Sequence, residues 1–158
     1  MSEKIHFCND LFNRGRFETR EVKVGITAIG GSNPIRIQSM TTTDTMDTIA
    51  TVEQSIRCIE AGAELVRITA PSKKEAENLA EIRKQLHAKG YKAPLVADIH
   101  FHYKRALEAA DADAACLRIN PGNIGSADRV RDVIQAARDH GCSMRIGVNA
   151  GSLEKELL

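Results

Sequence analysis

Short apolar stretches alternate along this chain with longer amphipathic stretches that end near glycines. Within each short stretch, apolar and polar residues alternate at every second position, which is the period of a β-strand. Strands separated by helices favour βαβ units and a parallel sheet. Five stretches are candidate strands, at residues 35–40, 64–70, 94–100, 114–120 and 143–149.

The stretches between the candidate strands carry apolar residues at steps of three and four, as one face of a helix does. One apolar stripe begins at Ile49 and ends before Gly62. Ser72 and Glu75 have the spacing of a capping box and predict the start of a second helix. Two further helices are expected, a short one around residues 104–110 and one that begins after Ser126.

The N-terminal part of the chain has a different pattern. Residues 1–20 are polar and rich in Arg and Asn, which predicts an irregular arm. Two short alternating runs flank Gly25 and predict a small β-hairpin. We therefore expect two parts, the arm at residues 1–20 and a unit at 21–158 that contains the hairpin and the strand–helix repeats.

Periodicity alone leaves open a doubly wound sheet and part of a barrel. Strands covered by helices on both faces usually have continuous apolar runs. Here Val66 and Ile68 point to one side and Arg67 to the other, and the first strand likewise has Ile35 and Ile37 on its apolar side. Helices must cover the apolar face, and the polar face then lines an interior. The predicted fold class is α/β, a partial TIM (β/α)8 barrel of about five strands with an N-terminal β-hairpin.

Three arginines lie on the polar face at what the pattern predicts to be equivalent depths. They are Arg67, Arg118 and Arg145, on the second, fourth and fifth strands. Burying them without partners would cost several kcal/mol each, so they are expected where an anion and water can reach them. The two parallel N–H groups of a guanidinium can bind two phosphate oxygens at once. In TIM barrels the active site lies at the C-terminal ends of the strands. We therefore expect a phosphate or diphosphate site there.

Other polar residues at the same strand ends can complete this site. His100, Asn120 and Asn149 can add neutral hydrogen bonds, and the glycine-containing loop at 120–126 can offer backbone N–H groups to an anion. Asp98 can form an ion pair with one of the arginines, which leaves positive charge uncompensated. The expected binding residues are Arg67, Asp98, His100, Arg118, Asn120, Arg145 and Asn149.

A metal site is the competing interpretation of this strand end. Asp98, His100 and His102 are spaced to share one face of a strand, and these residue types bind zinc or iron. The surrounding arginines would repel a divalent cation, so we expect no metal there. Cysteines stand at positions 8, 58, 116 and 142, without the clustered spacing that an iron–sulfur site requires.

Composition excludes some classes of partner. Lys and Arg number 22 against 21 for Asp and Glu, which lacks the basic excess of nucleic-acid and polybasic membrane surfaces. No run approaches the roughly 18 apolar residues of a membrane span. Scattered cysteines in a chain without an apolar leader predict reduced thiols and a cytoplasmic protein.

Longer motifs in the same segments resemble one enzyme family. Ile29–Gly31 with residues 34–41, then 64–67, 94–101, 117–123 and 145–152, are similar in order and spacing to the barrel of the 4-hydroxy-3-methylbut-2-enyl diphosphate synthase family. The resemblance covers about residues 12–155. It implies that Arg67, Arg118 and Arg145 grip a cyclodiphosphate, with Asn120 and Asn149 alongside and Asp98 and His100 lining the pocket.

The resemblance also implies a reaction and its partners. The family reductively opens 2-C-methyl-D-erythritol 2,4-cyclodiphosphate, eliminates water and forms the allylic diphosphate. Electrons come from ferredoxin or flavodoxin through a [4Fe–4S] cluster, and the enzyme is a homodimer. The family's cluster ligands, three cysteines and a glutamate of a C-terminal domain, match nothing in this chain. We therefore expect the substrate-binding part of the enzyme, inactive by itself.

Two alternatives remain open. One is another phosphate-binding barrel enzyme, such as a pterin-binding synthase, which would need no cluster. The other is a non-catalytic binding module that sequesters a phosphorylated metabolite. The presence of a cysteine-containing cluster domain in the parent protein would distinguish the first from the family that the motifs resemble.

Overall fold

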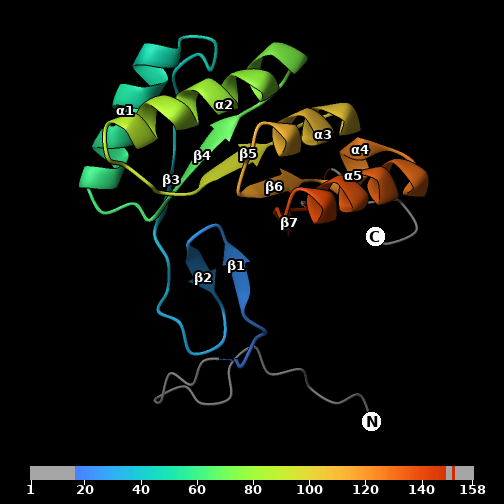
Figure 1. Cartoon of the computed structure of the whole chain (residues 1–158). Coiled ribbons are helices and arrows are strands. Elements are labelled where there is room, and N and C mark those ends of the chain that lie inside the picture. The colour runs from blue at the N-terminus through green and yellow to red at the C-terminus, as the bar shows by residue number, and fades with distance from the viewer. Residues whose placement is uncertain (1–16, 149–150, 152–158) are drawn as a thin grey trace.

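Five parallel strands form the central sheet, and they follow one another in chain order (Figure 1). The structure is a computed structural model that describes residues 17–148 and residue 151. An order without reversal is that of a barrel wall, whereas a doubly wound sheet changes direction at a switch point. The strands are β3 (Gln38–Met40), β4 (Leu65–Thr69), β5 (Leu95–Asp98), β6 (Cys116–Ile119) and β7 (Ser143–Ile146).

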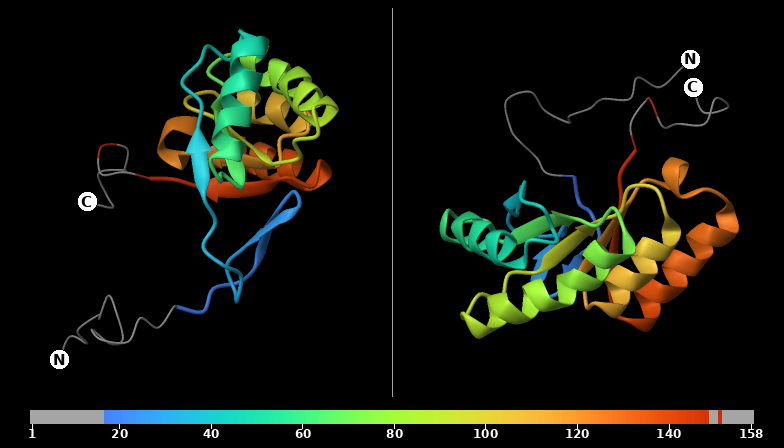
Figure 2. Two further views of the ribbon diagram at one scale, coloured as in Figure 1. Left: turned by 90° about the vertical axis from the view of Figure 1, so that its left-hand side faces the viewer. Right: turned by 90° about the horizontal axis from the view of Figure 1, so that it is seen from above.

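Helices connect the strands and lie together on the outer side of the curved sheet (Figure 2). The four expected helices are present, so the predicted βαβ units are confirmed. Among the described residues, no helix is long and apolar enough to cross a membrane. The four are α1 (Thr48–Glu60), α2 (Lys73–Ala88), α3 (Tyr103–Asp111) and α5 (Ala127–Asp139).

One further short helix, α4 (Pro121–Ile124), lies where a loop was predicted. Pro121 is at its first turn, where the fixed φ of proline suits a helix start. The side chain of Asn120 accepts a hydrogen bond from the backbone N–H of Gly122 at 3.2 Å and caps the turn. The loop is therefore organised around Asn120 before α5 begins.

The outer face of the sheet forms the main hydrophobic core. Strand residues such as Ile68 and Leu117 are fully buried against helix residues such as Leu79 and Val133. Fully burying an aliphatic side chain contributes about 1.5–3 kcal/mol. The apolar positions that the alternation assigned to the middle strands are therefore the ones that hold the helices.

The hairpin packs at the N-terminal end of the inner face. Strands β1 (Val22–Val24) and β2 (Thr27–Ile29) pair antiparallel around Gly25, as predicted. Gly25 has a φ of +56°, and a Cβ there would lie 3.2 Å from the side chain of Pro94. Val24 forms a second small core with Leu65, Val96 and Cys116.

The first strand departs from the prediction. It begins only at Gln38, so Ile35 and Ile37 precede it and are 80% and 59% exposed instead of covered by helices. Arg36 explains this, because it donates hydrogen bonds to the backbone carbonyl of Ala28 and to the Glu64 carboxylate. These bonds tie the segment to the hairpin as an extended link.

The last strand departs at its other end. Ile146 and Val148 are 56% and 59% exposed, although the alternation placed them on the covered face. Only Met144, earlier in β7, packs against the core beneath α5. Ile49 is also exposed, because it precedes the part of α1 that faces the sheet, where Val52 is buried.

Candidate anion-binding site at the C-terminal strand ends

Asp98 is the centre of the polar cluster at the C-terminal strand ends. Its side chain is 1% exposed and accepts hydrogen bonds from two arginines on the neighbouring strands. Arg67 Nη2 lies 2.6 Å from Oδ2, and Arg118 Nη1 lies 3.1 Å from Oδ1. Each oxygen of one buried carboxylate thus holds one guanidinium, which brings both guanidinium groups to the same place.

Strand register shows that the three arginines do not start at the same depth. Asp98, Arg118 and Arg145 form one row across β5, β6 and β7. Arg67 pairs with Val96, which is one inward-facing step before Asp98. The prediction of equivalent depths is therefore wrong for Arg67, because parallel register and not distance from the strand end sets the rows. The long side chain of Arg67 nevertheless reaches Asp98.

Arg145 takes a different partner. Its Nη1 atom donates a hydrogen bond to Oε1 of Gln38 at 2.9 Å, which joins the two edge strands β7 and β3 across the inner face. Gln38 was not among the predicted site residues. The signal in the sequence was its position on the polar side of the first strand, but the contact joins residues 107 positions apart. Neutral Gln38 holds Arg145 without cancelling its charge.

The cluster carries excess positive charge. Three guanidinium groups face one carboxylate and one neutral amide, which leaves two formal positive charges among these five side chains. Arg67 and Arg118 are 25% and 21% exposed. Guanidinium groups with so little access to water are stabilised by an anion, so the arrangement suits a ligand with phosphoryl oxygens.

Two buried nitrogen atoms at this end have no partner within the described residues. They are Nε of Arg67 and Nδ1 of His100. The other ring nitrogen of His100, Nε2, lies 3.9 Å from Oδ2 of Asp98. An unsatisfied buried donor or acceptor costs about 1–3 kcal/mol, so a ligand oxygen that reaches these atoms would gain that energy back.

The other predicted binding groups fare differently. Asn120 is 2% exposed, and its side chain caps α4. The backbone N–H groups of Gly122, Asn123 and Ile124 all bond to Asn120, so these three are not available to an anion. The small turn satisfies its own donors. Asn149 lies outside the described residues.

A metal site needs several ligand side chains close together, and the described residues do not provide them. They contain no group of three or more His, Cys, Asp or Glu side chains that could hold a metal ion. Burial raises the pKa of Cys142 to about 11, and its Sγ atom donates to the carbonyl oxygen of Ala114 at 2.9 Å. Burial also raises the pKa of Cys116. These two cysteines are not part of any such group of ligand side chains in the described residues.

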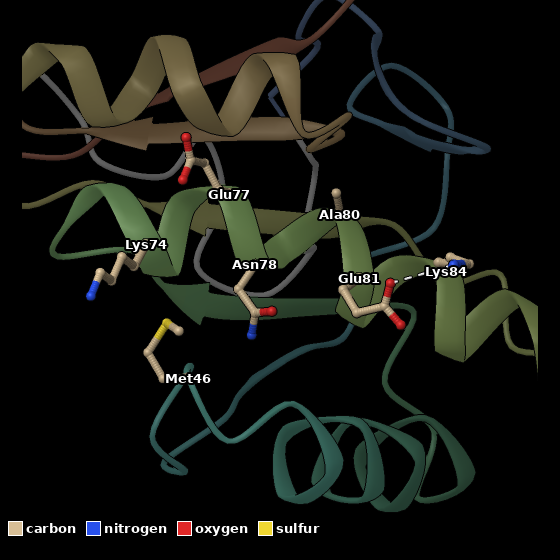
Figure 3. Close-up of a pocket in the computed structure, with 7 residues that line it drawn as sticks. All are labelled: Met46, Lys74, Glu77, Asn78, Ala80, Glu81 and Lys84. Atoms are coloured by element: carbon tan, nitrogen blue, oxygen red, sulfur yellow. Dashed lines mark ion pairs between the residues drawn. The ribbon is translucent and has the colours of Figure 1, made fainter.

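A groove lies elsewhere, on the exposed side of α2 (Figure 3). It has a volume of about 450 Å³ and includes Met46 and Asn78. Its two lysines and two glutamates balance one another, and Lys84 lies 3.6 Å from Glu81. The groove is open and lined by surface side chains, so the arginine cluster is the better candidate for ligand chemistry.

Comparison with known proteins gives the same family at two levels. Residues 19–158 match the GcpE TIM-barrel domain family. The chain is 62% identical over 143 residues to 4-hydroxy-3-methylbut-2-en-1-yl diphosphate synthase (flavodoxin) of Caulobacter vibrioides, covering 90% of the chain and 36% of that protein. It is 59% identical over 140 residues to the enzyme of the same name from Rhodospirillum rubrum, covering 89% and 35%. The chain thus spans about a third of the length of these relatives.

Solved structures show the fold. A Yersinia pestis DHPS with a pterine-sulfa conjugate has a TM-score of 0.58 at 16% identity, covering 81% of this chain and 49% of that one. Xanthomonas albilineans dihydropteroate synthase has a TM-score of 0.56 at 19% identity, covering 82% and 49%. At such identities the likeness concerns the barrel architecture alone. With its family match, its relatives and its five-stranded barrel wall, the chain belongs to the GcpE TIM-barrel domain family.

Proposed function

We propose that this chain is the substrate-binding part of a 4-hydroxy-3-methylbut-2-enyl diphosphate synthase and binds 2-C-methyl-D-erythritol 2,4-cyclodiphosphate. The observation that carries the proposal is the pair of guanidinium groups on the buried Asp98 carboxylate, together with the uncancelled charge of Arg145 on the strand next to Arg118. The names of the relatives support the choice of this substrate over other phosphorylated compounds. Isoprenoid biosynthesis is the process that the proposal implies.

The arginines would act by charge and by geometry. Asp98 holds Arg67 and Arg118 side by side, so little side-chain entropy is lost when they bind a diphosphate. Arg145 approaches from the far edge of the sheet and can reach a second phosphoryl group. His100, Asn120 and Asn149 remain proposed neutral contacts. Neutralising the diphosphate in a fixed position favours the build-up of charge when the ring opens.

The reaction needs two electrons and releases one water molecule. We propose that a [4Fe–4S] cluster supplies the electrons one at a time when bound, and that flavodoxin or ferredoxin reduces it. The relatives' names include flavodoxin. The described residues contain no group of three or more ligand side chains that could hold such a cluster, so we assign it to residues other than these. We also propose that the enzyme is a homodimer located in the cytoplasm.

Replacing one arginine tests the proposed site. Arg118→Ala should weaken binding of the cyclodiphosphate by about 2–5 kcal/mol, measured by isothermal titration calorimetry, because it removes one guanidinium and leaves Asp98 with a single partner. Arg83→Ala is the matched control. It removes the same charge from α2, where Arg83 pairs with Asp113, and should leave the affinity within about twofold.

The outcomes separate three situations. Loss with Arg118→Ala alone supports a local site. Equal losses in both variants would mean that overall charge attracts the ligand, and unchanged affinity in both would remove Arg118 from the site. The pterin-binding alternative rests on fold likeness at 16–19% identity, against 59–62% for the diphosphate synthases, and no contact described above favours it.

A further inference from the structure

Gly147 lies against the guanidinium group of Arg118. It follows β7 directly, and its backbone N–H donates to the carbonyl oxygen of Ile119 at 2.9 Å, which fixes its position beside β6. A Cβ atom on Gly147 would lie 2.8 Å from Nη2, 2.9 Å from Nε and 3.2 Å from Cζ of Arg118. Real Cβ atoms essentially never come within 3.0 Å of another heavy atom, so any side chain at position 147 must displace this guanidinium.

Backbone conformation does not require glycine at this position. Seven described glycines have a positive φ, and Gly147 is not among them. A left-handed backbone conformation is therefore not the reason for glycine at position 147. What position 147 requires is space, and the group that uses the space is one of the two that hold Asp98.

The atoms next to Gly147 are chemically significant. Arg118 binds Asp98 through Nη1, while Nε and Nη2 form the other edge of the guanidinium, beside the glycine. That edge carries two parallel N–H groups and faces the backbone of Gly147 directly. A side chain at position 147 would push this edge away and would turn Nη1 away from Asp98.

We propose that Gly147 is a positioning residue of the anion site: its missing side chain leaves the room in which the Arg118 guanidinium binds Asp98. This inference rests on the proposed function, because it assumes that the arginine cluster binds an anion. It adds a residue that has no polar side chain and that a search for phosphate-binding groups would overlook.

The first test compares substitutions at two adjacent residues, one that enlarges Gly147 and one that shortens Val148. Gly147→Ala should weaken binding of inorganic pyrophosphate about tenfold, the size of losing one charge-assisted hydrogen bond. Val148→Ala is the control, because Val148 is exposed on the adjacent position of the same segment, and should change the affinity less than about twofold. Both affinities are measured by NMR titration of the full chain.

A double-mutant cycle distinguishes positioning from general disturbance. In an Arg118→Ala background, the added Gly147→Ala should cost less than about twofold, because the atoms that its Cβ meets are gone. A full tenfold loss in that background would show that Gly147 acts without Arg118, and the proposal would be wrong. Millimolar pyrophosphate keeps the weaker variants measurable.

The Nε–H signal of Arg118 gives a readout that needs no ligand. Its NMR cross-peak, assigned by its loss in Arg118→Ala, should shift in Gly147→Ala and stay in place in Val148→Ala. An unchanged signal would overturn the positioning role even if Gly147→Ala binds poorly. If the wild-type chain binds no pyrophosphate, the proposed anion site fails, whereas the signal still decides whether Gly147 positions Arg118.

Discussion

The two faces of the central sheet differ sharply although the same strands build both. On the outer face Ile68 and Leu117 are fully buried beneath helices. On the inner face Arg67 and Arg118 come one residue before or after them, and about a quarter of each side chain is exposed. A single step along a strand therefore separates a residue that stabilises the fold from one that carries charge.

The inner face is itself divided along the strands. Near the hairpin it is apolar, with Leu65 and Val96 against Val24. Toward the C-terminal ends it becomes charged, with Asp98 as the only buried acid within the described residues. The lesson is that strand alternation separates the two faces, whereas depth along the strand separates packing from binding. Substitutions on each surface should therefore change different measured quantities.

The largest effect is expected on the outer face. Leu117→Ala should lower the free energy of unfolding by about 2–5 kcal/mol, because it leaves a cavity in the core beneath the helices. Urea denaturation followed by circular dichroism measures it. Val148→Ala, at an exposed position, should cost less than about 0.5 kcal/mol. If the two variants lost similar free energies of unfolding, the covered and the open parts of the outer face would not differ in the way described.

A substitution at Asp98 should move stability and binding in opposite directions. Asp98→Asn should lower the free energy of unfolding by about 1–3 kcal/mol, because two guanidinium groups lose their counter-charge. Pyrophosphate affinity should rise at least about threefold. Asparagine keeps one acceptor oxygen in place, so organisation is partly retained while a full negative charge near the anion is removed.

The control for Asp98→Asn is Asp111→Asn, which removes an equal charge from an exposed residue paired with His140. Both quantities should stay close to those of the wild type. A fall in affinity with Asp98→Asn would mean that orienting the arginines outweighs the repulsion between the carboxylate and the ligand. Calorimetry and urea denaturation on the same samples measure the two quantities.

Gln38 offers a smaller and more selective change. Gln38→Glu keeps the shape of the side chain but adds a carboxylate at 2.9 Å from Arg145, which cancels one of the two surplus charges. Pyrophosphate affinity relative to wild type should fall about three- to tenfold at pH 7. It should recover only at a pH below the ordinary pKa of a glutamate, because Arg145 lowers the pKa of a carboxyl group beside it. Gln135→Glu adds the same charge on α5, away from the arginines. Its pyrophosphate affinity should equal that of the wild type at every pH.

The smallest effect concerns the link between the hairpin and the sheet edge. The N–H of Ile37 and then Arg36 lower the pKa of Glu64 below its usual 4.5. A carboxyl group with a lowered pKa stabilises the folded state above its unfolded pKa, and this contribution disappears as the pH falls through the folded pKa. Glu64→Gln should therefore slightly lower the melting temperature at pH 7 and leave it unchanged near pH 3. Glu53→Gln, at another exposed glutamate, should show no such pH-dependent difference.

Local patterns were enough to predict the middle strands and the helices that cover them. Alternation assigned Val66, Ile68 and Leu117 to the covered face, and burial confirms it. The pattern failed at the edge strands, where Ile37 and Ile146 are exposed. Alternation states which side a residue faces but not whether another element packs there, and at an edge only one neighbouring strand is present.

The site was predicted in part for the same reason. Arg67, Asp98 and Arg118 meet because their strands are neighbours, which chain order already implied. The offset depth of Arg67 depends on register, and the contact between Arg145 and Gln38 depends on curvature across the whole sheet. Neither property can be predicted from a short stretch of the sequence. Whether these residues bind a ligand is still a prediction.

The hairpin gives the interior a floor. Val24 packs with its apolar neighbours at the end away from the arginines, and Gly25 fits closely against Pro94. A charged solute would lose its hydration shell on passing these apolar side chains, which is costly, so it does not pass through this end of the inner face. An anion should therefore approach the arginines from the C-terminal strand ends or through the side that the five described strands leave open, and not past the hairpin.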